Sequence, residues 1–307
     1  MKKIILSATV IAACAVMVSC EKENTPVNDD RMVQFTSGIT ATPTRVSIDS
    51  NGKSVWEEGD PIGIYMLENG TDVVAENAAN RKYTASSSGL TTNFAPVENP
   101  IYYPGNLTAT VDFIGYHPYN NAASGFAYPI DVSNQASQTG IDFLWAKADN
   151  HGAGYNKDDE QNGINVNFTF KHQLAKLILR VKNGAGVTGD LSTVSINGMY
   201  TRASFDLKGA GGITGMSDAR SFAPATVTRG TIYEAILLPV ESLGAGHTVT
   251  FINESGEEFT WVMTDKLQNL APGTIYDYEI TLTKIKVTAN GTIDQWTVGS
   301  TGNGTAE

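Results

Sequence analysis

The chain has 307 residues, and this length suggests about two domains. Hydrophobic residues make up 41% and charged residues 17%, a composition that allows a buried core and excludes wholesale disorder. Acidic residues outnumber Lys and Arg by 32 to 21, giving a net charge of −11, so we expect no nucleic-acid partner. Both cysteines lie within the first twenty residues, which excludes a disulfide framework or a cysteine zinc site further along.

The N-terminus has the pattern of an export signal. Lys2 and Lys3 precede an apolar run over residues 4–18, followed abruptly by polar residues. The run of about 15 residues is shorter than the roughly 20 that a membrane-spanning helix needs. We therefore expect residues 1–19 to be a signal peptide.

The end of this signal resembles a bacterial lipobox. Residues 17–20 read Met-Val-Ser-Cys, and in a lipobox the cysteine is acylated and becomes the first mature residue. We expect Cys20 to carry the acyl chains that hold the protein on a membrane, and residues 20–31 to form a polar tether. Acidic and lysine residues directly after Cys20 resemble the surface-export signal of Bacteroidetes lipoproteins, which implies the outer face of the outer membrane. The alternative is an ordinary signal peptide with an incidental cysteine.

Alternating apolar and polar residues predict β-strands along most of the remaining chain. In the first strand, residues 33–41, the apolar side chains Val33, Phe35 and Ile39 fall on one face. The same pattern predicts further strands at residues 62–66, 111–116, 164–170, 194–196, 233–238, 247–252, 259–263 and 276–282.

The expected fold is all-β. Many short strands with few convincing helices favour antiparallel β-sandwiches over alternating β/α units. The Gly- and Asp-rich stretch at residues 151–163 is the natural boundary. We therefore expect an N-terminal sandwich over residues 32–160 and a C-terminal sandwich over residues 161–307.

Two positions break the alternation. One set of residues also fits a helical i, i+3, i+4, i+7 spacing: Leu174, Leu177, Ile178 and Val181. Because this set directly continues an alternating stretch, we expect a strand with a bulge. Near the C-terminus, apolar residues change from even positions up to Leu282 to odd positions from Ile285, which predicts a bend near residues 283–284. Asn290-Gly291 then predicts a tight turn, so that the chain ends in a hairpin.

No group of residues predicts catalysis or metal binding. Four histidines lack the spacing and the neighbouring carboxylates of a metal site, and we expect each to be structural: His117, His151, His172 and His247. Residues 184–189 match a dinucleotide-binding spacing, but a strand follows instead of a helix, so we interpret them as a loop. Residues 158–163 match half a calcium loop without its final glutamate, which favours a solvated linker over incidental calcium binding. We therefore expect no enzyme activity, cofactor or metal.

A series of short motifs resembles the fimbrillin-like lipoproteins of Bacteroidetes, the subunits of type V pili. The motifs, which cover nearly the whole mature chain, are Trp56-Glu57-Glu58-Gly59-Asp60-Pro61-Ile62-Gly63-Ile64-Tyr65, Tyr116-His117-Pro118-Tyr119, Phe143-Leu144-Trp145-Ala146, residues 168–177, Leu238-Pro239, Leu270-Ala271-Pro272-Gly273, Tyr276-Asp277-Tyr278, Ile293 and Trp296. The resemblance implies two tandem transthyretin-like antiparallel β-sandwich domains and a structural, non-enzymatic subunit. It also implies that a trypsin-like surface protease cuts after an arginine, removing an N-terminal strand before polymerisation.

Arg45 is the expected cleavage site, which makes Val46 the new N-terminus. Arg45 follows Thr42-Pro43-Thr44, a proline-containing stretch that we expect to be an exposed loop. Cleavage there would separate the lipid anchor and the first strand from the body together. Arg31 is the alternative site, but cleavage after it would leave the strand in place.

Removal of the first strand would open a groove. Burying Val33, Phe35 and Ile39 stabilises by roughly 1.5–3 kcal/mol each, so their loss would expose apolar side chains and unpaired backbone groups. A strand of another subunit could fill this groove by β-augmentation. The candidate donor is the segment 284–298, and the alternative is that this hairpin packs within its own domain. Its apolar residues facing the groove would be Ile285, Val287 and Ala289.

Two functions follow from these expectations. The first is a stalk or tip subunit of a surface pilus, with other pilin subunits, the outer membrane through Cys20, a surface protease and host or bacterial surface ligands as partners. The second is a monomeric surface lipoprotein that binds glycans or host ligands. Its candidate sugar platforms, which would otherwise be core residues, are Tyr102, Tyr103, Tyr116 and Tyr119.

Overall fold

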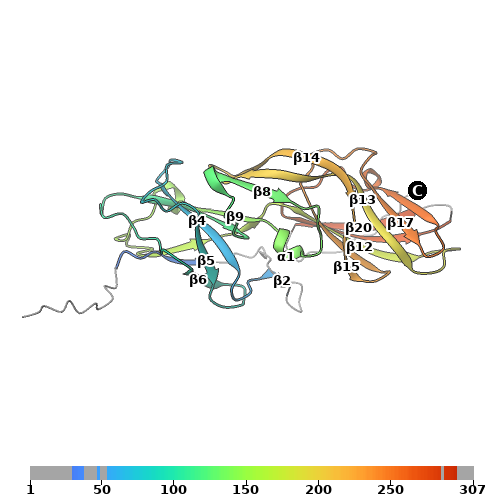
Figure 1. Ribbon diagram of the computed structural model, residues 1–307, viewed down its shortest axis with the longest axis horizontal. Coiled ribbons are helices and arrows are strands. Elements are labelled where there is room, and N and C mark those ends of the chain that lie inside the picture. The colour runs from blue at the N-terminus through green and yellow to red at the C-terminus, as the bar shows by residue number, and fades with distance from the viewer. Residues whose placement is uncertain (1–29, 38–46, 49–53, 285–286, 296–307) are drawn as a thin grey trace, which may run out of the picture. The chain divides into compact units, whose positions relative to one another are not determined.

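The computed structural model describes residues 30–37, 47–48, 54–284 and 287–295. The chain divides into two units, residues 1–30 and residues 31–307; Asp30 is the only described residue of the first, and all the strands belong to the second. The regular secondary structure of the second unit is almost all strand (Figure 1), which confirms the all-β prediction. Within the described ranges, no helix is long and apolar enough to cross a membrane.

The strands predicted from alternation are present, although some differ in length, and the part of the predicted first strand beyond Ser37 lies outside the described residues. The strands are β1 Gln34–Ser37, β2 Ser47–Ile48, β3 Ser54–Val55, β4 Pro61–Glu68, β5 Arg81–Ala85, β6 Thr92–Pro96, β7 Val111–His117, β8 Ala127–Asp131, β9 Leu144–Ala148, β10 Asn165–Phe168, β11 Lys171–His172, β12 Ala175–Asn183, β13 Leu191–Asp206, β14 Gly212–Phe222, β15 Ala225–Thr228, β16 Ile232–Leu237, β17 Thr248–Asn253, β18 Glu258–Val262, β19 Thr274–Leu282 and β20 Val287–Gln295. The helical elements are one short helix, α1 Gln138–Ile141, and the 3-10 turns Ser124–Phe126, Asn150–Gly152 and Met263–Asp265.

The strands of the described ranges form three sheets and a two-stranded ribbon. The first sheet has eight strands in the order β10-β1-β6-β5-β4-β7-β9-β11. The second has five strands in the order β15-β16-β12-β19-β20. The third runs β14-β13-β17-β18, with β8 also paired to the long strand β13. Strands β2 and β3 pair only with each other.

Strands β4 and β7, at the centre of the first sheet, are buried on both faces. On one face, Ile64 and Phe113 belong to a core shared with β1, β5, β6 and β10. On the other face, Tyr65 and Ile114 belong to a core shared with β8, β13 and β16. Since strands buried on both faces are apolar at consecutive positions, both strands have near-continuous hydrophobic sequences.

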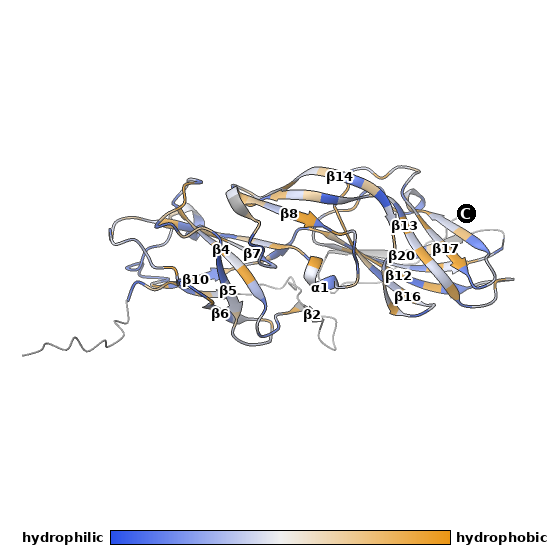
Figure 2. Ribbon diagram, viewed as in Figure 1, coloured by the Kyte–Doolittle hydropathy of each residue, from blue (hydrophilic) through white to orange (hydrophobic). Residues whose placement is uncertain are grey.

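The second and third sheets enclose a core of their own. Buried side chains of β12 and β19 pack in one cluster with those of β13, β17 and β18. The rings of Trp261 on β18 and Tyr278 on β19, for example, lie with their centroids 5.2 Å apart. Along β17, buried positions alternate with partly exposed ones, and hydrophobic and hydrophilic residues share these strands in Figure 2. One face of each of these strands therefore packs in the core, as in a sandwich.

The chain crosses from the first sheet to the second between His172, where β11 ends, and Ala175, where β12 begins. Even-numbered Val166 is in the core of the first sheet, whereas odd-numbered Leu177 and Leu179 are in the core of the second. The predicted strand over residues 174–181 is confirmed as β12, but the predicted bulge is wrong. The break in alternation marks a change of sheet, because a strand entering a new sheet can present its other face.

The sheets do not divide at the predicted boundary after residue 160. Strands β10 and β11, which follow that boundary, complete the first sheet. Strand β8, which precedes it, pairs with β13 in the third sheet, and β8 and β13 run side by side in Figure 1. The tandem transthyretin-like arrangement stays a prediction.

The last two described strands form a hairpin whose turn differs from the predicted one. Strands β19 and β20 are antiparallel neighbours, and the connection between them includes residues 283–284, where the alternation changes. The predicted turn at Asn290-Gly291 is wrong, since β20 runs without interruption through these residues. A Cβ atom at Gly291 would lie 2.1 Å from the ring of Tyr278, its cross-strand partner, so Gly291 serves close packing.

The same pairing of glycine with tyrosine occurs at the centre of the first sheet. Gly63 on β4 faces Tyr116 on β7, and a Cβ atom at Gly63 would lie 2.3 Å from the Tyr116 ring. The ring is fully buried, and its hydroxyl hydrogen-bonds to the side chain of Asn80 and, at 3.0 Å, to the carbonyl oxygen of Asn120. The ring is thus held in place over the glycine, and a side chain at Gly63 would have to displace it.

We expect Gly63→Ala to lower the free energy of unfolding by about 1–3 kcal/mol through overpacking. Gly212→Ala is the matched control, because Gly212 is also in a strand but has no atom within 4 Å of its would-be Cβ. The control should change the free energy by less than about 0.5 kcal/mol. Urea unfolding followed by tryptophan fluorescence measures both, and equal effects would contradict the proposed role of the Tyr116 ring.

Candidate functional site: the seat of the first strand

Strand β1 occupies an interior position in the first sheet. It pairs in parallel with β10, where Phe35 faces Val166, and antiparallel with β6, where Phe35 faces Phe94. This confirms the expectation that the first strand is inserted in a sheet, for residues 34–37. An interior strand satisfies backbone groups on two neighbours, so both β6 and β10 depend on it for part of their hydrogen bonding.

The residues just before β1 are paired as well. The Val33 amide donates to the carbonyl oxygen of Ile101 at 3.0 Å, and the Tyr103 amide donates to the carbonyl oxygen of Arg31 at 2.9 Å. Met32 and Tyr102 form an antiparallel bridge between these bonds. This partner segment is not among the predicted strands, although Ile101 and Tyr103 alternate with Tyr102 as in a strand.

The inward face of the segment is buried as predicted. Val33, Phe35 and Ser37 are at most 3% exposed, in agreement with the predicted alternation. The Phe35 ring lies 5.1 Å from the Tyr83 ring and 5.2 Å from the Phe113 ring, both edge to face. It stacks on Phe168 at 5.6 Å, with an interplanar angle of 13°.

These contacts join strands that are not neighbours in the sheet. Phe35 is on β1 and Phe113 on β7, with β6, β5 and β4 between them in the strand order. Their rings can touch only if the sheet curls around a common core. Phe35 is therefore a central side chain of the first core, and the position that β1 occupies is lined by aromatic rings.

Several predicted site residues lie outside the described residues. They are Cys20, Ile39, Arg45, Val46 and Ile285.

The C-terminal strand β20 pairs within the second sheet. Among the described residues, β20 pairs only with β19, which makes it an edge strand. The backbone of Val287 begins β20, and Ala289 is fully buried in the core between the second and third sheets. The hairpin therefore packs against its own sheet, which is the predicted alternative to strand donation. The role of this segment as a donor stays a prediction.

The structure brings together two of the four histidines and a carboxylate. His172 Nδ1 lies 2.9 Å from Asp142 Oδ1, and both residues are buried. His117, 2% exposed, donates from Nδ1 to the carbonyl oxygen of Pro61 at 2.9 Å. The sequence analysis placed no carboxylate near these histidines, because Asp142 and His172 are thirty residues apart in sequence. In the described part of the chain, no group of three or more His, Cys, Asp or Glu residues could hold a metal ion.

Burial governs the protonation of His117. It lowers the pKa of His117 to about 4; the hydrogen bond to Pro61 and the charge of Asp142 oppose the shift, and His172 adds to it. Asp60 is partly exposed, and its pKa is shifted in the opposite direction: partial burial raises it to about 6, against the hydrogen bond from the Glu57 amide. Neutral His117 is therefore the form that the fold accommodates.

Of the four candidate sugar platforms, two are core residues. Tyr103 and Tyr116 are 2% and 0% exposed and cannot receive a ligand on their faces. Tyr102 and Tyr119 are partly exposed, and the Lys82 ammonium lies 5.5 Å from the centroid of the Tyr119 ring. Tyr102 is thus the platform residue that stays accessible in the segment next to β1.

We expect Phe35→Ala to lower the free energy of unfolding by about 3–5 kcal/mol, because it removes an aromatic ring from the centre of the first core. Thr36→Ala is the matched control on the opposite face of the same strand, where it removes one hydrogen bond to Asn167 of 3.1 Å. The control should cost no more than about 1 kcal/mol. Urea unfolding of the uncleaved chain measures both, and similar costs for the two variants would show that Phe35 is not a core residue.

His117 should make the fold acid-sensitive. Its folded pKa of about 4 is below the unfolded value of 6.5, so protons favour the unfolded state and stability falls as pH decreases from 6.5 to 4. The difference corresponds to roughly 3 kcal/mol, whereas Asp60 gives an opposite slope in the same range. His117→Gln should therefore be less acid-sensitive than the natural chain in urea unfolding at pH 4 and pH 7. His151→Asn, at an exposed histidine, should behave like the natural chain, and an unchanged pH slope in His117→Gln would contradict the assignment.

Comparison with known proteins relates this chain to a family. A model of the fimbrillin-like family matches residues 44–296. The chain is 33% identical over 318 residues to the candidate fimbrium subunit Fim1C of Bacteroides uniformis, with 99% of each chain covered.

Solved structures give the same assignment at the level of the fold. The crystal structure of a candidate cell adhesion protein from Bacteroides uniformis is 32% identical, has a TM-score of 0.72 and covers 89% of this chain and 100% of that one. The tip fimbrial protein Mfa3 of Porphyromonas gingivalis, solved with a C-terminal truncation, is 8% identical with a TM-score of 0.50 and covers 86% of this chain and 99% of that one, which shows the fold alone. The family match over most of the chain and the full-length similarity to a fimbrium subunit show that this chain belongs to the fimbrillin-like family.

Proposed function

We propose that this chain is a structural subunit of a cell-surface pilus, exported as a lipoprotein and polymerised by strand exchange after proteolysis following Arg45. Membership of the fimbrillin-like family supports the pilus role. The observation that carries the assembly mechanism is the interior position of β1, whose removal would leave a complete strand-shaped vacancy in the first sheet.

The vacancy would be able to bind a strand for two physical reasons. Its edges, β6 and β10, would present unpaired backbone N–H and C=O groups on both sides. Its floor would consist of the rings that now surround Phe35, namely Tyr83, Phe113 and Phe168. A donor strand with apolar residues at alternate positions would satisfy both requirements, as in other cases of β-augmentation.

The C-terminal segment remains our candidate donor. Strand β20 is an edge strand and could leave its sheet with the loss of one ladder, whereas an interior strand would break two. Its neighbour β19 has independent support, because Asp277 accepts from the Arg180 guanidinium at 2.9 Å and β19 pairs with β12 from Ile275 to Leu282. The cost of release is the exposure of Ala289 and of the Tyr278 ring that packs on Gly291.

The order of the sequence suits this scheme. Cys20, the proposed lipidation site, and β1 both precede Arg45, so a single cut after Arg45 would release the body from the membrane and open the groove at once. The family match begins at residue 44, so β1 lies outside it. The outer membrane, a trypsin-like surface protease and other pilin subunits are thus the proposed partners, with surface ligands of host or bacterial cells as adhesion targets.

We expect pilus-incorporated protein to begin at Val46 and Arg45→Gln to block both processing and polymerisation. Arg31→Gln is the matched control: the carbonyl of Arg31 accepts from the Tyr103 amide and Met32 is bridged to Tyr102, so the bond after Arg31 is held in a paired segment. This control should be processed and polymerise like the natural chain. N-terminal sequencing of purified polymers measures the cut.

Polymer formation separates the two functions given by the sequence. After trypsin treatment, a strand-exchanged pilin should give ladders that resist heat and detergent on a gel, since each subunit would hold its neighbour through a full strand. Assembled protein that still carries an acylated Cys20 would assign an anchoring or accessory role instead. A treated chain that gives no ladders would overturn the strand-exchange mechanism and favour the monomeric ligand-binding protein.

A further inference from the structure

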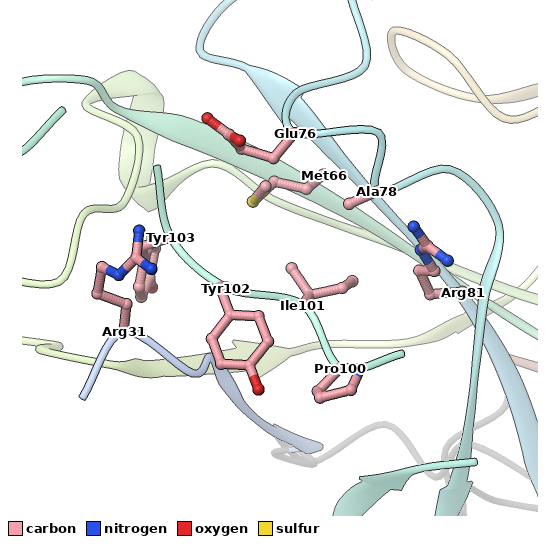
Figure 3. Close-up of a pocket in the computed structure, with 9 residues that line it drawn as sticks. All are labelled: Arg31, Met66, Glu76, Ala78, Arg81, Pro100, Ile101, Tyr102 and Tyr103. Atoms are coloured by element: carbon pink, nitrogen blue, oxygen red, sulfur yellow. The ribbon is translucent and has the colours of Figure 1, made fainter. Parts of the chain in front are cut away.

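A pocket of about 250 Å³ lies beside the segment that precedes β1. Its lining is formed by Arg31, Met66, Glu76, Ala78, Arg81, Pro100, Ile101, Tyr102 and Tyr103 (Figure 3). The side chains of Met66, Ala78 and Ile101 are buried behind its wall, and charged and aromatic residues line most of its surface. Its volume is just below the roughly 300–1,000 Å³ of typical small-molecule sites, so its occupant would be about as large as one sugar ring.

The charges of the rim differ in sign from those of the whole chain. Two guanidinium groups, of Arg31 and Arg81, and one carboxylate, of Glu76, line the pocket, which gives the lining a net positive charge in a chain whose net charge is −11. Figure 3 shows the two arginines on opposite sides, with the ring of Tyr102 between them. A cationic rim around an aromatic platform favours an anionic ligand with a flat or ring-shaped body.

The walls of the pocket are held in place by the surrounding structure. The Ile101 amide donates to the Tyr83 hydroxyl at 2.7 Å, which fixes the segment that carries Tyr102. The loop opposite is tied by the Met66 amide, which donates to the carbonyl oxygen of Ala78 at 3.0 Å. Arg81 Nη2 donates to the carbonyl oxygen of Asn77 at 2.9 Å. A guanidinium has five N–H donors, so Arg81 can be oriented by this bond and still donate to a ligand.

The same loop contains a strained backbone. Glu76 and Asn77 have φ angles of +48° and +54°, in the left-handed region that residues other than glycine rarely adopt. Two such residues in succession cost free energy that other contacts must offset, and strain of this kind concentrates at binding sites. Here the strained turn carries Glu76 to the rim and presents the Asn77 carbonyl to Arg81.

We propose that this pocket binds a small acidic saccharide unit, a hexuronic acid, with its carboxylate on the Arg81 guanidinium and its ring against Tyr102. One consequence rests on the proposed function: Arg31 belongs to the segment that cleavage after Arg45 removes, so the complete pocket exists only in the uncleaved precursor. A bound ligand would then lie between Arg31 of the first segment and Arg81 of the body, and processing would remove the Arg31 side of its site.

The test uses the uncleaved full chain and galacturonic acid as the probe. We expect a saturable heat of binding in titration calorimetry and a rise in unfolding temperature, because a ligand that binds only the folded state stabilises it. Galactose, which has the same ring without the carboxylate, should bind at least tenfold more weakly. Sodium acetate at the same concentration supplies the carboxylate without the ring, and it should give no saturable effect. Equal responses to galacturonic acid and galactose, or none to galacturonic acid, would overturn the proposal.

Variants of the rim locate the effect. Arg81→Gln should weaken galacturonic acid binding about tenfold or more, since it removes a charged hydrogen-bond donor. Glu76→Gln should strengthen it by removing a like charge, and this variant keeps the proposal testable if Arg81→Gln fails to fold. Arg229→Gln is the matched control. Arg229 is exposed, pairs with Glu254 and does not line the pocket. Unchanged binding in both rim variants, or a loss in the control, would contradict the site. Since no arm needs cleavage, a failure of processing at Arg45 would leave these results unaffected.

Discussion

The packing of Phe35 against the rings of Tyr83, Phe113 and Phe168 is the contact on which the first sheet depends. It brings strands that are distant in the strand order around one core, and it does so with a side chain from a strand of only four described residues. A short strand is weakly held by its own backbone, so the aromatic contacts and the pairing on two sides supply most of its stability. Strand β1 packs strongly in the core, yet it is separated in sequence from the other strands of its sheet. A strand that another one could replace needs both properties.

The period of two along each strand explains much of the remaining architecture. Where both faces of β4 and β7 are covered, the period disappears because every position is buried. Where the chain changes sheet between β11 and β12, the apolar positions change parity because the strand enters a new core. Between β19 and β20 the chain turns, and β20 returns to the same core with Ala289 at an odd position. Close packing then imposes the small residues: Gly63 and Gly291 each lie under a tyrosine ring of the neighbouring strand, where no side chain would fit.

Polar and charged groups occur both inside the cores and at the surface pocket. The buried pair of His172 and Asp142 and the neutral His117 are among the polar groups inside the fold, and their hydrogen bonds offset part of the cost of burial. The pocket beside β1 places two arginines on the surface of an acidic chain. Because Arg31 lies shortly before β1, the strand and one wall of the pocket belong to a single segment, and a cut after Arg45 would remove both together.

The sequence by itself determined the all-β class, most strand positions and the inward face of the first strand, because these depend on a local repeat that can be read from adjacent residues. It also gave the motifs of the fimbrillin-like family, which the comparisons confirm. It could not give the pairing of Asp142 with His172, the crossing between sheets after His172, or the role of the 101–103 segment as a partner of residues 31–33. Those features join residues far apart in the chain, and only the tertiary structure decides them, because hydrogen-bond partners and shared cores are set by which strands become neighbours in space.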